Sequence, residues 1–356
     1  AHEAGLEYHA WVSVLAQQGL PKAWYTVNWM GQNASESPAY ETRNTMLDPR
    51  NREVHKYLAK KLAEIASVQQ VDYVLLDDLR YTEAILPKGL SQQYGLTMNG
   101  EYAPADYCYC ADCTRIFQDL TGTDILRVAD PSKVQAWAQF RCDALTDLAN
   151  ELCTVIHTHG KKVSASVFPN FEDNARKMVR QEWPKWNLDA VFAANFNDFY
   201  AEQPWWIGQA VREEVQAVQG KDIPVYSSFL VCRDWEHKAP EADSETFGLT
   251  PSQLDEAVMG SVRNSAAGVS LLTAEDMTDA HWTSFAQAAR EAGEAVSEKP
   301  LTRAEAEQAK AEVCKDFVAS ICPETKRIKD EHAVHVGDRT MRLHWSTFGE
   351  KPADGR

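Results

Sequence analysis

Two adjacent carboxylates, Asp77 and Asp78, close a short apolar run over residues 71–76, and Arg80 follows them. A run of this length after an amphipathic helix predicts a buried parallel strand. In α/β proteins, catalytic and ligand-binding groups collect at the carboxyl ends of such strands. Neighbouring carboxylates can push their pKa values apart, which suits acid–base chemistry. The alternative is that these aspartates only cap the following turn.

Three cysteines form a second chemically distinctive group: Cys108, Cys110 and Cys113 have C-x-C-x-x-C spacing. A zinc site would need a fourth ligand, and the paired C-x-x-C pattern of zinc knuckles is absent. A disulfide within the group and free thiols are the alternatives. We therefore predict no metal ion and no cofactor.

The composition narrows the class of protein. The chain has 356 residues, 44% of them hydrophobic, which is enough for one large core or two ordinary ones. The formal net charge of −16, without clustered Lys and Arg, argues against a nucleic-acid partner. No apolar stretch has the length of a transmembrane helix, so we predict no membrane partner. The motifs G-x-G-x-x-G, P-loop and G-x-S-x-G are also absent.

The chain start resembles the last turn of a helix rather than a signal peptide, so we expect a fragment or processed product. We predict a secreted or periplasmic location. The 11 Trp and 12 Tyr favour a carbohydrate ligand, because aromatic faces stack on sugar rings, although such residues also fill cores.

Short apolar strands alternate with amphipathic helices, which predicts an α/β fold with a parallel sheet. The first long helix is expected to start with Asp48 as N-cap and Pro49 in the first helical position. We predict long loops over residues 20–47 and 80–112, facing the substrate or covering the barrel rim. The expected strands span residues 6–15, 71–76, 163–168, 188–197, 223–231 and 268–273.

Polar residues follow successive strands, which favours a TIM-type (β/α) barrel over an open sheet. We find about six strands where a closed barrel has eight, and the two missing βα units would precede residue 1. The predicted fold is thus an incomplete barrel over residues 1–298. Residues 299–356 are expected to form a helical linker and the start of a further module. The polar groups are Asp77 and Asp78, Asn170, Asn195 and Asn197, Ser227 and Ser228, and Glu275 and Asp276.

Several of these segments resemble the family-10-like glycosyl hydrolases, which have TIM-barrel domains. Residues 72–77 with Arg80 and Tyr81 are similar to the family segment D-G-[apolar]-x-[apolar]-D-x-x-R-Y. Residues 6–11 resemble the third-strand pattern G-[LI]-x-[VY]-H-A-W. The resemblance covers residues 1–290 and implies a barrel glycosidase with Asp77 at its mouth. Further similar segments are 107–113 with Phe117 and Gly122 (C-Y-C-x-x-C-x-x-x-F), 167–170, 179–183 and 186–190.

The chain also departs from the family pattern. Tyr73 stands where members usually have Gly, and residues 193–197 read A-A-N-F-N where the sixth strand commonly ends P-M-x-Y-H. The tail, residues 341–356, resembles the opening segment of some α/β-hydrolase esterases. This implies an additional esterase-like domain as a possible partner in the parent protein.

Glycoside hydrolysis requires two carboxyl groups across the scissile bond. We predict Asp77, Glu275 and Asp78 as catalytic, with Asp276, Glu83 and Asp198 as competitors for the second carboxylate. Asp78 either points to the opposite side of the strand, pairs with Arg80 or enters the loop. Glu275 is also explained by the start of a following helix. The predicted substrate contacts are His9, Trp11, Arg80, Tyr81, Asn170, Asn195 and Asn197.

Three hypotheses follow for function. The first is a glycoside hydrolase acting on a polysaccharide or oligosaccharide by two-carboxylate catalysis. The second is a non-catalytic carbohydrate-binding barrel. The third is a metal-dependent hydrolase that uses Cys108, Cys110 and Cys113 or the aspartate pair.

Overall fold

The computed structural model describes residues 2–40, 45–98, 100–231, 248–297, 334–336 and 339–341. The chain forms two compact units, Ala1–Gly293 and Glu294–Arg356. In the second unit, β7 (Val334–Val336) pairs antiparallel with β8 (Arg339–Met341). The predicted helix over residues 302–320 and the esterase-like tail, Met341 excepted, lie outside the described residues.

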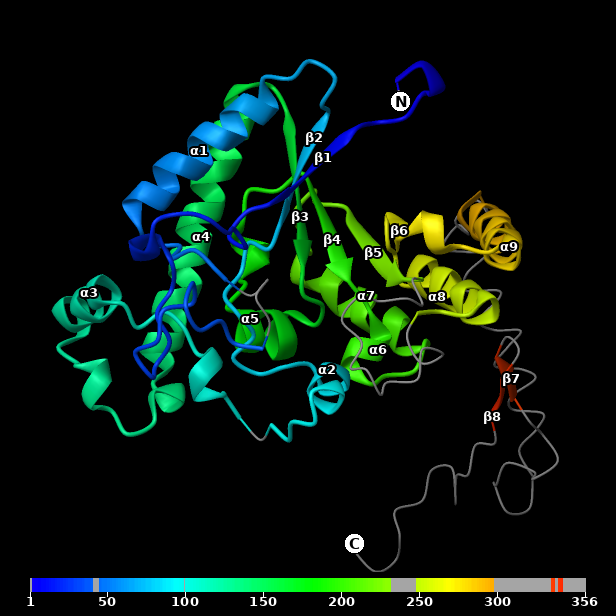
Figure 1. The fold of residues 1–356 in the computed structure, drawn as a ribbon. Coiled ribbons are helices and arrows are strands. Elements are labelled where there is room, and N and C mark those ends of the chain that lie inside the picture. Colours follow the sequence, from blue (N-terminus) through cyan, green and yellow to red (C-terminus); the bar gives the residue numbers. More distant parts are fainter. Residues whose placement is uncertain are drawn as a thin grey trace, which may run out of the picture. The chain divides into compact units, whose positions relative to one another are not determined.

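Six parallel strands form the sheet of the first unit, and each pairs with the next in chain order. The sheet curls into half a barrel with helices on its outer side, which confirms the predicted incomplete TIM-type fold (Figure 1). Among the described residues, no pairing joins the first strand to the last, so the barrel is open between them. The strands are β1 (His9–Ser13), β2 (Tyr73–Asp77), β3 (Lys162–Val167), β4 (Ala190–Ala194), β5 (Val225–Leu230) and β6 (Gly268–Leu272).

The helices of this unit connect the strands and cover the outer face of the curl. α1 packs beside α4, and α7 packs beside α8. No helix in the described part of the chain has both the length and the apolar character needed to cross a bilayer. The helices are α1 (Arg52–Ala66), α2 (Lys88–Gln93), α3 (Ala111–Thr121), α4 (Gln135–Thr158), α5 (Lys177–Val179), α6 (Asn197–Tyr200), α7 (Trp206–Ala217), α8 (Pro251–Arg263) and α9 (Asp279–Ser297).

The first helix begins later than we predicted. Asn51 is the N-cap of α1, and its side chain accepts hydrogen bonds from the backbone N–H groups of Glu53 and Val54. This leaves Pro49 before the helix and Asp48 buried in the core. The prediction of Asp48 as N-cap was therefore wrong, because an Asn three residues later caps the helix instead.

Alternation along the strands separates a packed face from an open one. On β2, Val74 and Leu76 point outward into the core beneath the helices and are fully buried. Leu75 and Asp77, the residues between and after them, face the inside of the curl. The same alternation recurs on β4, where Val191 and Ala193 are fully buried and Phe192 and Ala194 line the inside of the curl. The inside of the half-barrel therefore carries a distinct set of side chains.

Candidate active site

The inner face of the sheet lines an open cavity of about 1330 Å³. Closed TIM barrels fill this space with side chains. Here the space is free, and it is larger than pockets that hold drug-sized ligands. The strand residues that line it are His9, Trp11, Ser13, Leu75, Asp77, Ser166, Phe192, Ala194, Tyr226, Ser228, Ser270 and Leu272, among others.

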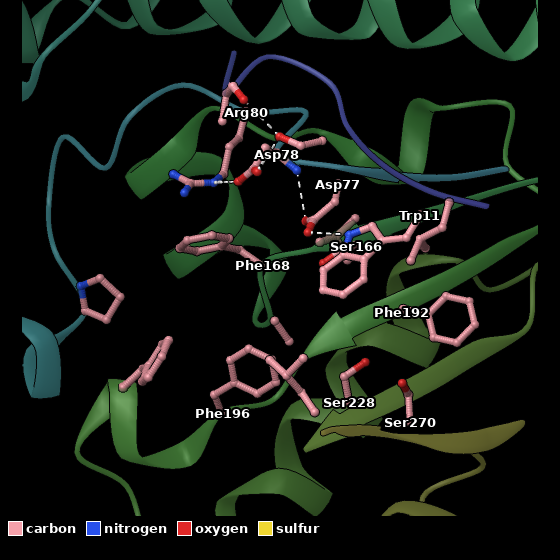
Figure 2. A pocket seen from close by; sticks show the side chains of 18 of the residues that line it. Trp11, Asp77, Asp78, Arg80, Ser166, Phe168, Phe192, Phe196, Ser228 and Ser270 are labelled. Carbon is pink, nitrogen blue, oxygen red and sulfur yellow. Dashed lines mark hydrogen bonds and ion pairs between the residues drawn. The ribbon is translucent and has the colours of Figure 1, made fainter. Parts of the chain in front are cut away.

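Both aspartates at the end of β2 line this cavity (Figure 2). The strand ends at Asp77, and Asp78 has a left-handed backbone with φ 49°. Aspartate tolerates this conformation better than most residues. Because the chain turns here, Asp78 does not point to the opposite side of the strand. It enters the loop and approaches Arg80, with Oδ1 at 3.5 Å from Nε, as two of our alternatives predicted.

Hydrogen bonds hold the two carboxyl groups in different ways. The Trp11 indole N–H donates to Asp77 Oδ2 at 2.8 Å, and the backbone N–H of Asp78 donates to Asp77 Oδ1 at 2.9 Å. The hydroxyl of Ser13, which lies opposite Asp77 on β1, donates to Asp78 Oδ2 at 2.8 Å. Asp78 therefore has both a hydroxyl donor and a cation beside it, whereas Asp77 has two neutral donors.

Burial raises the pKa of Asp77, and the negative charge of Asp78 raises it further. The donors around Asp77 and the Arg80 charge oppose this rise without cancelling it. One carboxyl in a pair is thereby biased toward its protonated form, which is the arrangement a general acid requires.

Arg80 connects the pair to a further carboxyl group. Its Nη1 lies 2.9 Å from Glu83 Oε1, and its guanidinium lies 5.5 Å from the centre of the Phe168 ring. Glu83 is nearly buried and also lines the cavity. The cluster Asp77, Asp78, Arg80 and Glu83 thus carries three carboxyl groups and one cation.

Aromatic rings continue along the inner face. His9 stacks on Tyr73 with ring centres 4.2 Å apart, and Phe192 stacks on Tyr226 at 4.8 Å. Burial lowers the pKa of His9, so its ring is neutral at pH 7. Trp11 is 63% exposed although its N–H is bonded to Asp77, which leaves its face open to a ligand.

The structure brings five predicted site residues together at the cavity: Asp77, Asp78, Arg80, His9 and Trp11. The other five do not line it. Tyr81 is buried, with Cys113 and Asp48 among its electrostatic neighbours. Glu275 is exposed on the short helix after β6, whereas its neighbour Asp276 lines the cavity and accepts a hydrogen bond from Thr273.

The three predicted asparagines have partners elsewhere. Asn195 is fully buried and donates to Glu214 Oε2 at 3.2 Å and to Ser227 Oγ at 2.8 Å. Asn170 donates to Glu213, and Asn197 donates to the carbonyl of Glu202 at 3.0 Å. The remaining competitor, Asp198, accepts from the backbone N–H of Gly248 and does not line the cavity. In the segment that departs from the family pattern, Ala194 and Phe196 face the cavity instead.

Sequence reasoning did not select several lining residues as site residues: Ser166 and Ser270 were missed, and Ser228 was noted only as a polar group at a strand end. Ser166, Ser228 and Ser270 lie on three different strands and add hydroxyl groups to the cavity. Ser166 lies close to Asp77, whereas Ser228 and Ser270 lie farther from the aspartates (Figure 2). For Ser166 and Ser228 a signal was available, because each stands between two residues that the alternation places on the packed, buried face of its strand. The prediction of site residues rested on strand ends, so Ser166 and Ser270, which lie inside their strands, were passed over.

No family profile matches the sequence, and no curated protein does. Among solved structures, the fold is similar to the PgaB (BpsB) glycoside hydrolase domain from Bordetella bronchiseptica. The identity is 15% and the TM-score 0.56, over 81% of this chain and 75% of that chain. A beta-galactosidase from the psychrophilic Marinomonas ef1 is similar at 9% identity and TM-score 0.51, over 82% of this chain and 50% of that chain. This likeness shows a barrel fold of the kind that these glycosidases have.

Proposed function

We propose that this chain is a glycoside hydrolase that cleaves an oligosaccharide or polysaccharide in the cavity of the half-barrel. The observation that carries the proposal is the pair Asp77 and Asp78 at the carboxyl end of β2, facing a cavity of about 1330 Å³. Carboxyl groups supply the chemistry of glycoside hydrolysis, and an open aromatic-lined cavity suits a sugar chain.

In this proposal Asp77 protonates the leaving oxygen. Its raised pKa keeps a proton available, because burial and the Asp78 charge both disfavour the carboxylate. The Ser13 hydroxyl, which donates to Asp78 Oδ2 at 2.8 Å, and Arg80, at 3.5 Å from Asp78 Oδ1, hold the Asp78 side chain beside Asp77. The Asp78 charge raises the pKa of Asp77 and, in this proposal, also stabilises the developing oxocarbenium ion.

The second carboxyl group is Asp276 in this proposal, in preference to Glu275. Asp276 lines the cavity from the end of β6, on the far edge of the sheet from β1. Both side chains are exposed, but Glu275 does not line the cavity. A distance of about 5 Å between the two working carboxyl groups would give retention, and about 6.5–9.5 Å inversion.

The charges in the cavity indicate the class of glycan. Asp77, Asp78, Glu83 and Asp276 line it together with one guanidinium, that of Arg80. An anionic glycan would be repelled by this excess of carboxyl groups, so the substrate is an uncharged or amino-sugar chain. We further propose membership of the family-10-like glycosyl hydrolases and a secreted or periplasmic location.

The test is hydrolysis of a glycan panel by the full chain, measured as release of reducing ends. The panel contains neutral glucans, chitosan-type amino-sugar polymers and an anionic pectin. We expect turnover of a neutral or amino-sugar polymer, and a loss of about 10²–10⁴-fold in kcat for Asp77→Asn. Asp147→Asn, at an exposed position on α4, is the matched control and should keep full activity. Undiminished activity of Asp77→Asn would refute the assignment.

A second candidate is a non-catalytic carbohydrate-binding barrel, favoured by the open edge between β1 and β6 among the described residues. Glycan binding with no reducing ends released, by any chain length that includes this unit, would support it. A hydrolase that uses the three cysteines as catalytic metal ligands is not supported, because none of them lines the cavity.

A further inference from the structure

A second cluster lies apart from the cavity and joins four residues from two distant segments. The Sγ atoms of Cys108, Cys110 and Cys113 and a carboxylate oxygen of Asp48 all lie within 4.8 Å of one another. Asp48 Oδ2 is 3.1 Å from Cys110 Sγ, 3.5 Å from Cys108 Sγ and 3.6 Å from Cys113 Sγ. Asp48 is the fourth potential ligand that the sequence pattern did not provide.

We propose that Asp48, Cys108, Cys110 and Cys113 form a structural zinc site. Zinc prefers four tetrahedral ligands, with bonds of about 2.3 Å to sulfur and about 2.0–2.2 Å to a carboxylate oxygen. A tetrahedron with these bonds has sulfur–oxygen edges of about 3.5 Å. The three observed separations, 3.1 to 3.6 Å, lie around that value.

Backbone amides point at the sulfur atoms as they do in metal–thiolate sites. The N–H groups of Val27 and Cys110 each donate to Cys108 Sγ at 3.4 Å, and the N–H of Cys113 donates to Cys110 Sγ at 3.4 Å. Such bonds stabilise negative sulfur and orient ligands from outside the coordination shell. On the fourth ligand, the backbone N–H of Arg50 donates to Asp48 Oδ1 at 3.0 Å.

Among the described residues, no ion pair balances the charge of this set. Asp48, Cys108 and Cys113 are almost completely buried. Within the described part of the chain, no Lys, Arg or His side chain forms an ion pair with Asp48. A buried carboxylate beside three sulfur atoms is costly unless a cation or protons compensate it. Zinc supplies the cation, and three thiolates with one carboxylate match its ligand preference.

The site would be structural because its four positions are all filled by the protein and it lies outside the cavity. It would fasten the long loop after β1, which ends near Asp48, to the long loop after β2, which carries the cysteines. Backbone pairing between Asn28 and Tyr107 joins the same two loops nearby. Both loops supply cavity residues, among them Tyr40 and Glu83, so zinc would stabilise the wall of the cavity.

The test is the metal content of the full chain. The protein is purified without chelator, and its zinc is quantified by inductively coupled plasma mass spectrometry. We expect one equivalent of zinc per chain. Replacement by Co²⁺ should give thiolate charge-transfer and tetrahedral d–d absorption. Asp48→Asn and Cys110→Ser should lose the metal, whereas Cys153→Ser, at a buried free cysteine on α4, should keep it.

Asp48→Cys is the control for variants that lose zinc because they misfold rather than because a ligand is missing. It provides a fourth thiolate, so it should bind one equivalent with a stronger cobalt charge-transfer band. Metal-free wild type that stays folded would overturn the site, as would zinc that survives both Asp48→Asn and Cys110→Ser. A disulfide within the cluster, detected as two missing thiols in the unfolded protein, would also overturn it. These readouts do not use catalysis, so they are independent of the proposed glycosidase activity.

Discussion

Asp77 and Glu214 are two carboxyl groups on opposite sides of the same sheet, and burial raises the pKa of both. Asp77 faces the cavity on the inner side. Glu214 lies on α7 at the outer side, is fully buried, and has a pKa raised to about 8. Its partner is the Asn195 amide at 3.2 Å, and its Oε1 has no hydrogen-bond partner among the described residues.

The difference between them teaches that a raised pKa records burial and does not by itself identify a catalytic group. Both side chains resist ionisation for the same physical reason. A substrate can reach only the one that lines the cavity. Access, together with a second charge such as Asp78, separates the proposed acid from a protonated core residue.

The largest effect on kcat is expected for a second pair of carboxyl groups, Asp276 and Glu275, of which only Asp276 lines the cavity. Asp276→Asn should lower kcat by about 10²-fold or more, because it removes the proposed second carboxyl group. Glu275→Gln, one residue away and outside the cavity lining, should leave kcat unchanged. Steady-state kinetics on the polymer that the wild type hydrolyses measures both. A large loss of kcat in Glu275→Gln and none in Asp276→Asn would make Glu275, our first choice from sequence, the second catalytic carboxyl group. It would also show that lining the cavity does not identify the catalytic carboxyl groups.

The next largest expected effect is on the pH dependence of the free energy of unfolding, and its cause is Glu214. Below the unfolded pKa of 4.5 both states hold the proton, and between 4.5 and about 8 only the folded state does. The free energy of unfolding of the wild type therefore falls as pH rises through this window, by roughly 5 kcal/mol in total from this group. Glu214→Gln has no such proton and should not show this loss.

Urea unfolding at pH 5 and pH 9 measures the Glu214 effect. The variant should be more stable relative to the wild type at pH 9 than at pH 5, with kcat close to that of the wild type. Equal pH dependence of the two proteins would show that Glu214 is not held protonated. A large loss of kcat would instead place Glu214 in the catalytic machinery.

The smallest effect is a pair of opposite shifts in the pH profile of kcat/KM. Asp78→Asn removes the charge that raises the pKa of Asp77, so the alkaline limb should move to lower pH. Trp11→Phe removes a donor that favours the ionised form of Asp77, so that limb should move to higher pH. Shifts in the same direction would mean that a group other than Asp77 sets the limb.

The sheet was predictable because short apolar runs and strand-end polar groups are local features of the sequence. Asp77 and its neighbour Asp78 followed from the same pattern. The asparagines did not, because the residue after a strand can turn either inward, as Asp78 does, or outward, as Asn195 does. That choice depends on backbone angles and on partners such as Glu214, which lie far along the chain.

The cysteine cluster shows a different limit. Spacing identified Cys108, Cys110 and Cys113, but the residue that completes the group is about 60 positions earlier. The Asp-Pro pair at 48 and 49 has the pattern of a helix start, so we interpreted Asp48 as an N-cap and did not consider it as a metal ligand. Asn51 provides an equally good cap, and only the folded loops bring Asp48 to the sulfur atoms.

The most direct test compares Asp77→Asn with Glu214→Gln on the same glycan, with rates and unfolding midpoints measured for both at pH 7. If the glycan is hydrolysed in the cavity with Asp77 as the acid, Asp77→Asn should lose at least about 10²-fold in kcat while its unfolding midpoint stays near that of the wild type. Under the same hypothesis, Glu214→Gln should hydrolyse the glycan at nearly the wild-type rate. Full hydrolysis by Asp77→Asn would contradict the assignment of this cavity as the active site.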